Sequence, residues 1–203
     1  LMQNTITYID LFSGLGGIRI GFEQALFERN LKGQCVFTAE IKPSAIKALN
    51  ANFPGEGIKP TDITKVQKND IPEFKVLLGG FPCQAFSYAG KQGGFADTRG
   101  TLFFELARAV KEIQPAVFVA ENVKGLLSHD GGRTFQTICN TVKELGYTLI
   151  ARKIMRAIMY ATPQKRERLI MIAVRDDLKD YAEFSWPSPY HRVLTLRDAF
   201  YPG

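Results

Sequence analysis

Two polar side chains follow apolar runs at positions where an α/β enzyme carries reactive groups. Cys83 comes after an apolar run, residues 74–78, and two glycines, a phenylalanine and a proline separate it from that run. A cysteine kept only for packing lies more often inside such a run, so this position favours a nucleophile. Glu121 comes directly after a second apolar run, residues 116–120, and is the second candidate reactive group.

Two arginines further along the chain are spaced for a common face. Gln164, Arg166 and Arg168 alternate, so in an extended segment their side chains point the same way. The apolar residues 169–174 that follow predict a buried strand, which would present both guanidinium groups at its start. A solvated basic edge explains the same spacing, so the arginine pair alone favours no function.

A glycine-rich turn near the amino terminus predicts a strand, loop and helix unit. Residues 6–12 read as a strand, three glycines follow within residues 14–17, and apolar residues then recur at helical spacing. The dinucleotide-binding pattern would need a glycine where Arg19 stands, and the phosphate-loop pattern would need a lysine where Phe22 stands. The sequence therefore indicates a binding loop that matches neither phosphate motif.

Two carboxylates come after the next predicted strands. Glu40 ends the strand of residues 35–39, where an acidic side chain accepts hydrogen bonds from ribose hydroxyls in nucleoside-binding α/β folds. A solvated strand end is the alternative for Glu40. Residues 60–63 read as a short strand end, where Asp62 could meet an adenine amino group or cap a turn.

The remaining pattern alternates helices with strands. Helices are expected from Pro43 to Pro54 and over residues 101–114 and 134–145, and strands over residues 147–158 and 168–174. This alternation predicts an α/β fold with a doubly wound, mostly parallel sheet and helices on both faces. The glycine-rich, basic residues 81–100 are a candidate lid over the site.

Composition limits the class of protein. The chain has 203 residues, 45% hydrophobic content and a net charge of +6, which suit one globular domain and permit an anionic partner such as nucleic acid. No apolar run is long enough to span a bilayer and no export leader is visible, so the cytoplasm is the default. Cys35 and Cys139 are expected in the core, and neither disulfides nor a metal site is indicated.

Four blocks of motif residues stand in order along the chain. They are Asp10-Leu11-Phe12-Ser13-Gly14-Leu15-Gly16-Gly17, Gly80-Phe81-Pro82-Cys83-Gln84, Glu121-Asn122-Val123 and Gln164-Lys165-Arg166-Glu167-Arg168. In this order they resemble the cofactor loop, the nucleophile motif, the acid motif and the arginine motif of the DNA (cytosine-5) methyltransferases, particularly those of bacterial restriction-modification systems. Three stretches, Phe86-Ser87, Gly90-Lys91-Gln92 and Arg99-Gly100-Thr101-Leu102-Phe103-Phe104, are also similar to the mobile loop and following helix of that family, so the resemblance covers nearly the whole chain.

The resemblance implies a Rossmann-like methyltransferase fold and a covalent mechanism. Cytosine C5 is a poor nucleophile, and addition of the Cys83 thiolate to C6 makes it reactive enough to take a methyl group from S-adenosylmethionine, which leaves S-adenosylhomocysteine. Protonated Glu121 would donate to N3 of the cytosine, and Arg168 would donate to O2. Arg166 would support the same site. A protonated carboxyl group needs burial, so we expect Glu121 to be enclosed once substrate is bound.

The resemblance also implies a cofactor site. Phe12 would pack near the adenosyl group and Glu40 would hold the ribose, while an isoleucine at position 41 departs from the large aromatic residue that several members stack on adenine. The implied cofactor residues are Phe12, Gly14, Gly16, Glu40, Ile41, Asp62, Ile63, Pro82 and Leu102.

Double-stranded DNA is the implied partner. The target base must leave the duplex, and residues 81–100 would close over it, with Lys91 and Arg99 either contacting phosphates or bracing that loop.

Members of this family continue into a target-recognition region and a last motif. We expect residues 1–185 to form the catalytic and cofactor-binding domain and residues 186–203 to lead towards that region. A split enzyme completed by a second polypeptide, a fragment and a decayed gene product are the alternatives. A non-catalytic protein that keeps the fold for cofactor or DNA binding is the competing function. A thiol hydrolase is disfavoured because no histidine neighbours Cys83.

Overall fold

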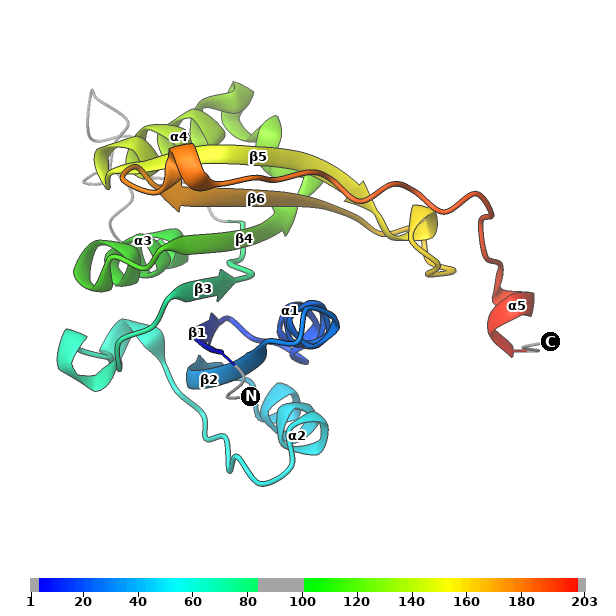
Figure 1. Ribbon diagram of the computed structural model, residues 1–203, viewed down its shortest axis with the longest axis horizontal. Helices are drawn as coiled ribbons and strands as arrows, with labels where there is room; N and C mark the ends of the chain where they lie inside the picture. The colour runs from blue at the N-terminus through cyan, green and yellow to red at the C-terminus, as the bar shows by residue number, and fades with distance from the viewer. Residues whose placement is uncertain (1–3, 84–100, 201–203) are drawn as a thin grey trace.

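A single six-stranded sheet forms the centre of the molecule. The computed structural model describes residues 4–83 and 101–200. The strand order is β2-β1-β3-β4-β6-β5 (Figure 1); β1, β2, β3 and β4 pair in parallel, and β6 runs antiparallel to both of its neighbours. The predicted mostly parallel sheet is therefore confirmed. The strands are β1 (Thr5–Leu11), β2 (Lys32–Ala39), β3 (Val76–Gly79), β4 (Val117–Val123), β5 (Tyr147–Arg156) and β6 (Glu167–Arg175).

The helices begin and end where the sequence supplies suitable residues. Pro43 opens one helix at its first turn, where a missing N–H costs nothing. The Thr101 side chain accepts a hydrogen bond from the Phe104 N–H and caps another. The helices are α1 (Gly17–Glu28), α2 (Pro43–Asn52), α3 (Leu102–Ile113), α4 (Arg133–Glu144) and α5 (Leu196–Phe200). In the described part of the chain, no helix has the length and apolarity to cross a membrane.

Helices cover both faces of the sheet, as two neighbouring glycines show. A Cβ at Gly79, the last residue of β3, would lie 2.6 Å from the side chain of Leu106 in α3. A Cβ at Gly80 would lie 3.4 Å from the side chain of Ile18 in α1. Successive residues of an extended chain point to opposite faces, so α1 and α3 lie on opposite sides of the sheet. The contact at Gly79 also leaves no room for a larger residue.

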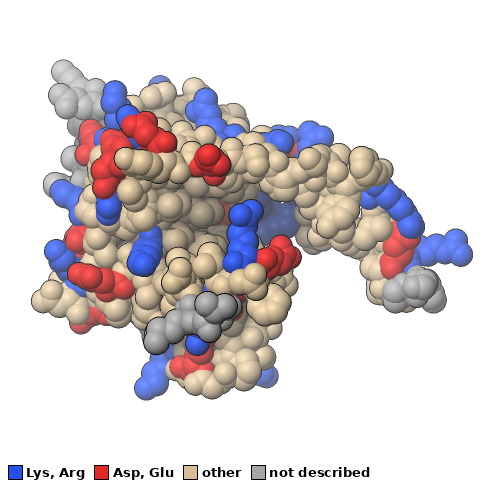
Figure 2. All heavy atoms as spheres, viewed as in Figure 1, with Lys and Arg blue, Asp and Glu red and all other residues tan. Residues whose placement is uncertain are grey.

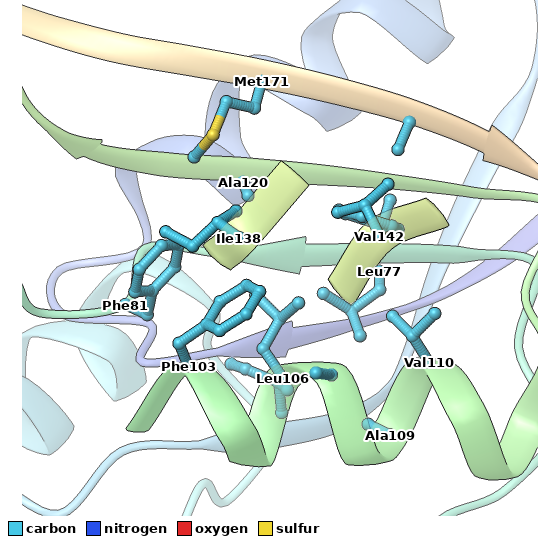
Figure 3. Close-up of a cluster of buried hydrophobic side chains, with 14 of the residues drawn as sticks. Leu77, Phe81, Phe103, Leu106, Ala109, Val110, Ala120, Ile138, Val142 and Met171 are labelled. Carbon is cyan, nitrogen blue, oxygen red and sulfur yellow. The ribbon is translucent and has the colours of Figure 1, made fainter. Parts of the chain in front are cut away.

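The main core lies between the sheet and the helices α3 and α4. Leu106 and Val110 of α3 pack towards Leu77 of β3, and Ile138 and Val142 of α4 belong to the same buried cluster (Figure 3). The side chains of Phe81 and Phe103 meet at the edge of this cluster, with ring centroids 5.1 Å apart. The start of α3 is thus packed against the segment that leads to Cys83.

The carboxy-terminal segment runs back along β5 and then projects from the body (Figures 1 and 2). The Lys153 ammonium lies 5.7 Å from the centroid of the Trp186 ring. Tyr190 donates its backbone N–H to the Met159 carbonyl over 2.9 Å. Beyond these contacts the segment is irregular until α5.

Three expectations from the sequence need comment. The strand end expected at residues 60–63 is wrong, because Asp62 caps a short 3-10 helix (Ile63–Lys65) by accepting hydrogen bonds from the N–H and hydroxyl of Thr64. Cys35 and Cys139, expected in the core, are partly buried free thiols, and Cys139 packs against the main cluster. The candidate lid lies mostly outside the described residues, which stop at Cys83 and resume at Thr101.

Candidate active site

The register of the sheet brings four strand ends to one edge. In the pairing, Leu11 of β1 lies beside Ala39 of β2 and beside Gly79 of β3, and Gly79 lies beside Ala120 of β4. The residues that come next along these strands are Phe12, Glu40, Gly80 and Glu121. Parallel strands present their carboxyl ends on the same side, which is where α/β proteins bind ligands. The sheet thus places the residues predicted to bind the cofactor and those predicted to be catalytic along one edge.

The acid and arginine motifs meet across β4 and β6. Antiparallel pairing places Val123 opposite Arg168, so the Arg168 side chain reaches Glu121 two residues away. Arg168 Nε lies 2.8 Å from Glu121 Oε1, and Arg166 lies 3.9 Å from the same oxygen. The Glu121 side chain is 19% exposed, and its Oε2 lies 3.5 Å from the Cβ position of Gly80. One oxygen therefore faces the arginines and the other faces the nucleophile loop.

The buried side-chain amide of Asn122 joins β4 to the loop that leads from β3 to Cys83. Asn122 is 2% exposed, and its Nδ2 donates a 2.8 Å hydrogen bond to the Phe81 carbonyl. Its Oδ1 accepts from the N–H of Val123. Cys83 is two residues beyond Phe81 and is partly buried against the core. Sequence reasoning placed Asn122 in the acid motif and assigned it no role, because a contact 41 residues away in the chain depends on the register of β3 and β4.

A cavity of about 370 Å³ opens beside the ends of β1, β2 and β3. Eight of the nine residues predicted to bind the cofactor line this cavity, namely Phe12, Gly14, Glu40, Ile41, Asp62, Ile63, Pro82 and Leu102. Gly16 does not line the cavity, because it packs against α2. The lining is completed by residues for which no role was predicted, namely Ala39, Lys42, Ala45, Thr61 and Gly80. The only signal for them was their position next to predicted residues in the sequence.

Glu40 organises one wall of this cavity. Its Oε2 accepts a 2.8 Å hydrogen bond from the Gly14 N–H of the glycine loop. Its Oε1 accepts hydrogen bonds from the N–H groups of Ile41 and Lys42 at the start of α2. Each carboxylate oxygen has two lone pairs, so Oε2 keeps one for a further donor. Glu40 therefore holds two loops together and can still accept a hydroxyl hydrogen bond.

The cavity has the size and the lining of a site for a small ligand that carries a nucleoside. A volume of about 370 Å³ lies within the range of small-molecule sites, and the lining combines apolar side chains with a few polar groups. Glu40 offers an acceptor for a ribose hydroxyl, and Asp62 offers one for an adenine amino group. Ile41 is 61% exposed and offers an aliphatic surface where a larger ring would cover more of a base.

A buried carboxyl group lies behind the glycine loop. Asp10 of β1 is 1% exposed, and within the described residues its Oδ2 has no hydrogen-bond partner. Burial raises the pKa of the Asp10 carboxyl to about 7, although Ser13 and the charge of Arg19 act in the opposite direction. Asp10 is thus a buried carboxyl group with one unpartnered oxygen among the described residues.

A second charged cluster flanks the arginines on the other side of β6. Glu167 contacts Lys124 at 3.0 Å and Arg156 at 2.9 Å, and the hydrogen bond from Lys124 lowers the pKa of its carboxyl group. These residues and Lys153 line a groove of about 380 Å³. The sequence pattern did not predict this groove, because it arises only where β4 and β5 end beside the start of β6.

Comparison with known proteins agrees with this geometry. The family model described as C-5 cytosine-specific DNA methylase matches residues 6–201. The chain belongs to this family. The family model spans the Cys83, Glu121 and Arg168 positions and the cavity-lining residues alike.

Relatives within the family are bacterial Type II methyltransferases. The chain is 50% identical to M.Eco47II of Escherichia coli. The alignment covers 100% of the chain and 48% of that relative. It is 43% identical to M.HhaI of Haemophilus parahaemolyticus, with 97% of the chain and 57% of the relative covered. The chain therefore spans about half the length of the curated relatives it matches.

The fold agrees with solved structures. An E. coli protein described as a DNA modification methyltransferase encoded within a prophage aligns with 97% of the chain and 54% of its own chain, at a TM-score of 0.74 and 28% identity. The Dnmt2 methyltransferase of S. pombe aligns with 96% of the chain and 55% of its own chain, at a TM-score of 0.66 and 22% identity. The second match shows the fold alone.

Proposed function

We propose that the chain is the catalytic and cofactor-binding part of a methyltransferase that acts on C5 of cytosine in DNA. The observation that carries the proposal is the juxtaposition of Glu121 with Arg168 and Arg166 beside the loop that presents Cys83. Residues 1–185 form the catalytic domain in this proposal. Residues 186–203 lead to a target-recognition region supplied by further sequence or by a second polypeptide. The bacterial relatives favour a cytoplasmic location.

The reaction begins at Cys83. Its thiolate attacks C6 of an extruded cytosine, so an S–C6 bond forms and ring electrons move towards N3 and O2. Glu121 delivers a proton to N3, and the guanidinium of Arg168 donates hydrogen bonds to O2. Arg166 adds positive charge at the same place. Each group thus stabilises charge that develops only as the thiolate adds.

The later steps return the thiol. Bound S-adenosylmethionine would supply the methyl group that C5 takes up. Phe12, Glu40, Asp62 and Ile41 are the residues that would hold this cofactor. A base then removes the C5 proton, the electrons of that bond restore the C5–C6 double bond, and the S–C6 bond breaks with its electron pair returning to Cys83. N3 gives its proton back to Glu121. Cys83 is therefore regenerated, as catalysis requires.

A basic groove supports DNA as the partner. Lys124, Lys153 and Arg156 bring three positive charges to it against the single negative charge of Glu167. Figure 2 shows basic side chains along the β5 side of the molecule and a hollow where the carboxy-terminal arm leaves the body. Phosphate contacts of this kind position a duplex without reading its sequence.

Covalent trapping tests the proposal. The substrate is a duplex in which 5-fluorocytosine replaces every cytosine, so the target site need not be known. Fluorine at C5 cannot leave as a proton, which preserves the adduct. The chain is incubated with this duplex and S-adenosylmethionine, alone and together with the carboxy-terminal half of M.Eco47II. Denaturing gels and intact mass spectrometry then report any protein–DNA species.

We expect an adduct with the wild-type chain and with Cys139→Ser, a matched control on α4, and none with Cys83→Ser. If S-adenosylmethionine binds but neither arrangement gives an adduct, the chain is a non-catalytic binding protein and the proposal fails.

A further inference from the structure

Arg19 stands where a dinucleotide-binding loop has its third glycine, and it is one of the most deeply buried side chains of the molecule. It lies on α1, is 2% exposed, and does not line the cofactor cavity. A buried arginine requires partners for its charge and its donors. The partners of Arg19 come from outside the glycine loop, and they show what this side chain holds in place.

The guanidinium group joins three elements. Nη1 donates a 2.8 Å hydrogen bond to Glu56, and Nη2 forms an ion pair with the other oxygen of the same carboxylate. Nε lies 2.9 Å from the Tyr8 hydroxyl of β1 and 3.2 Å from Glu23 on α1. The two-point contact with Glu56 fixes the segment that follows α2 in both position and orientation.

The flat face of the same guanidinium packs on Phe53. Arg19 Cζ lies 3.6 Å from the centroid of the Phe53 ring, a cation–π contact at the end of α2. The Phe53 ring also packs against the glycine loop. A Cβ built on Gly16 would lie only 2.6 Å from a carbon of this ring. Phe53 thus lies between Arg19 and the backbone of Gly16.

A second contact ties the same helix end to the same loop. Asn52 Nδ2 donates a 2.8 Å hydrogen bond to the Leu15 carbonyl. Gly16 has a φ of 84°, a left-handed conformation that glycine adopts without strain, so contacts from neighbouring residues such as these are what hold the loop in one position. Neither Asn52 nor Phe53 lines the cofactor cavity, so this support reaches the loop from outside the cavity.

We propose that Arg19 is a positioning residue for the cofactor: through Glu56 and Phe53 it holds the end of α2 against Leu15 and Gly16, and so fixes the loop that binds S-adenosylmethionine. The inference rests on the proposed function for the identity of the cofactor. The contacts themselves belong to this chain, and they explain why an arginine, and not a glycine, follows the loop. The guanidinium never meets the cofactor in this account.

Two substitutions separate this role from general stability. Arg19→Lys keeps the charge but loses the planar stack and the two-point contact. Glu56→Gln removes the ion pair but keeps the shape of a partly exposed side chain. We expect this variant to fold, so it tests the inference even if Arg19→Lys fails to fold. Glu28→Gln, at an exposed position on the same helix, is the matched control.

Two measurements are made on each variant. Hydrogen exchange followed by mass spectrometry compares peptides covering residues 13–17 with peptides covering β4, in the absence of cofactor. Calorimetry gives the dissociation constant for S-adenosylhomocysteine. We expect Arg19→Lys and Glu56→Gln to speed exchange in the glycine loop several-fold while β4 stays protected. We also expect both to weaken binding by about tenfold, and Glu28→Gln to match the wild type.

Loop exchange that stays at the wild-type rate in both variants overturns the inference, as does exchange that rises equally in β4. A wild-type chain that binds no S-adenosylhomocysteine contradicts the proposed function, and loop exchange still decides whether Arg19 positions the loop. A wild-type chain that binds while both variants bind equally well overturns the inference and leaves the proposed function intact.

Discussion

Glu40 follows β2 and Glu121 lies near the end of β4, at the same edge of the sheet, yet their surroundings differ in kind. The oxygens of Glu40 accept three backbone N–H groups, all from residues within 26 positions along the chain. One oxygen of Glu121, Oε1, meets the side chains of Arg168 on β6 and of Arg166 just before it, more than 40 positions away. Backbone donors therefore build the first site, and side chains from a paired strand build the second.

This difference indicates a division of labour. The backbone donors around Glu40 take up their positions when the chain folds. The cavity beside Glu40 is therefore suited to a ligand of constant shape. Guanidinium groups around Glu121 are partly exposed and are already placed to stabilise charge that develops on a substrate. We therefore expect substitutions in the Glu121 half to change chemistry, and substitutions in the Glu40 half to change binding and stability.

The largest effect is expected at Arg168. Arg168→Lys keeps a positive charge but cannot reproduce the directed guanidinium donors, so methyl transfer should fall about 100-fold. The free energy of unfolding should change by less than about 1 kcal/mol, because the side chain is partly exposed. Transfer of labelled methyl groups to duplex DNA and a denaturant titration provide the two readouts. If the variant loses enough stability to explain its slower methyl transfer, Arg168 acts through the fold, and the proposed division between chemistry and stability is wrong.

A smaller effect, on stability and its pH dependence, is expected at Asp10. Its pKa in the folded state, about 7, lies above the value of about 4 in an unfolded chain. The contribution of Asp10 to stability is therefore fully present below pH 4 and is lost as the pH rises through 7. Asp10→Asn should be more stable than wild type at pH 8 by an amount on the order of 4 kcal/mol, with the difference shrinking towards pH 5.

Denaturant titrations of both proteins at several pH values measure that difference. Parallel pH profiles for Asp10→Asn and wild type would show that the carboxyl group of Asp10 is already ionised in the folded state at low pH.

The smallest effect is expected at Ile41. A tryptophan there would cover more of the face of a bound adenine, so Ile41→Trp should tighten binding of S-adenosylhomocysteine about three- to tenfold. Ile41→Leu, which changes shape without adding a ring, is the control. Unchanged or weaker binding by the tryptophan variant would mean that adenine does not lie on this side chain.

Much of this arrangement was predictable because it depends on local pattern. Apolar runs that end in glycine or acidic residues predicted the carboxyl edge of the sheet, and the alternation of Arg166 and Arg168 predicted their convergence. Asp62 was ambiguous, since a carboxylate after a proline suits a strand end or a cap, and hydrogen bonds to Thr64 favour the cap.

The contacts that could not be predicted join residues far apart in sequence. The hydrogen bond from Asn122 to Phe81 depends on the pairing of β3 with β4, and Arg19 is buried only because Glu56 and Phe53 reach it from the end of α2. In the sequence, Arg19 was visible only as a departure from a glycine motif. Its partners 34 and 37 positions away follow no local spacing rule.

The division between the two acidic strand ends is tested most directly by the affinity for S-adenosylhomocysteine of Glu40→Gln and Glu121→Gln, measured side by side by calorimetry. Loss of charged hydrogen bonds around the cofactor should weaken binding by Glu40→Gln about tenfold or more, and Glu121→Gln should bind within about twofold of wild type. A loss of affinity in Glu121→Gln equal to that in Glu40→Gln would contradict the account.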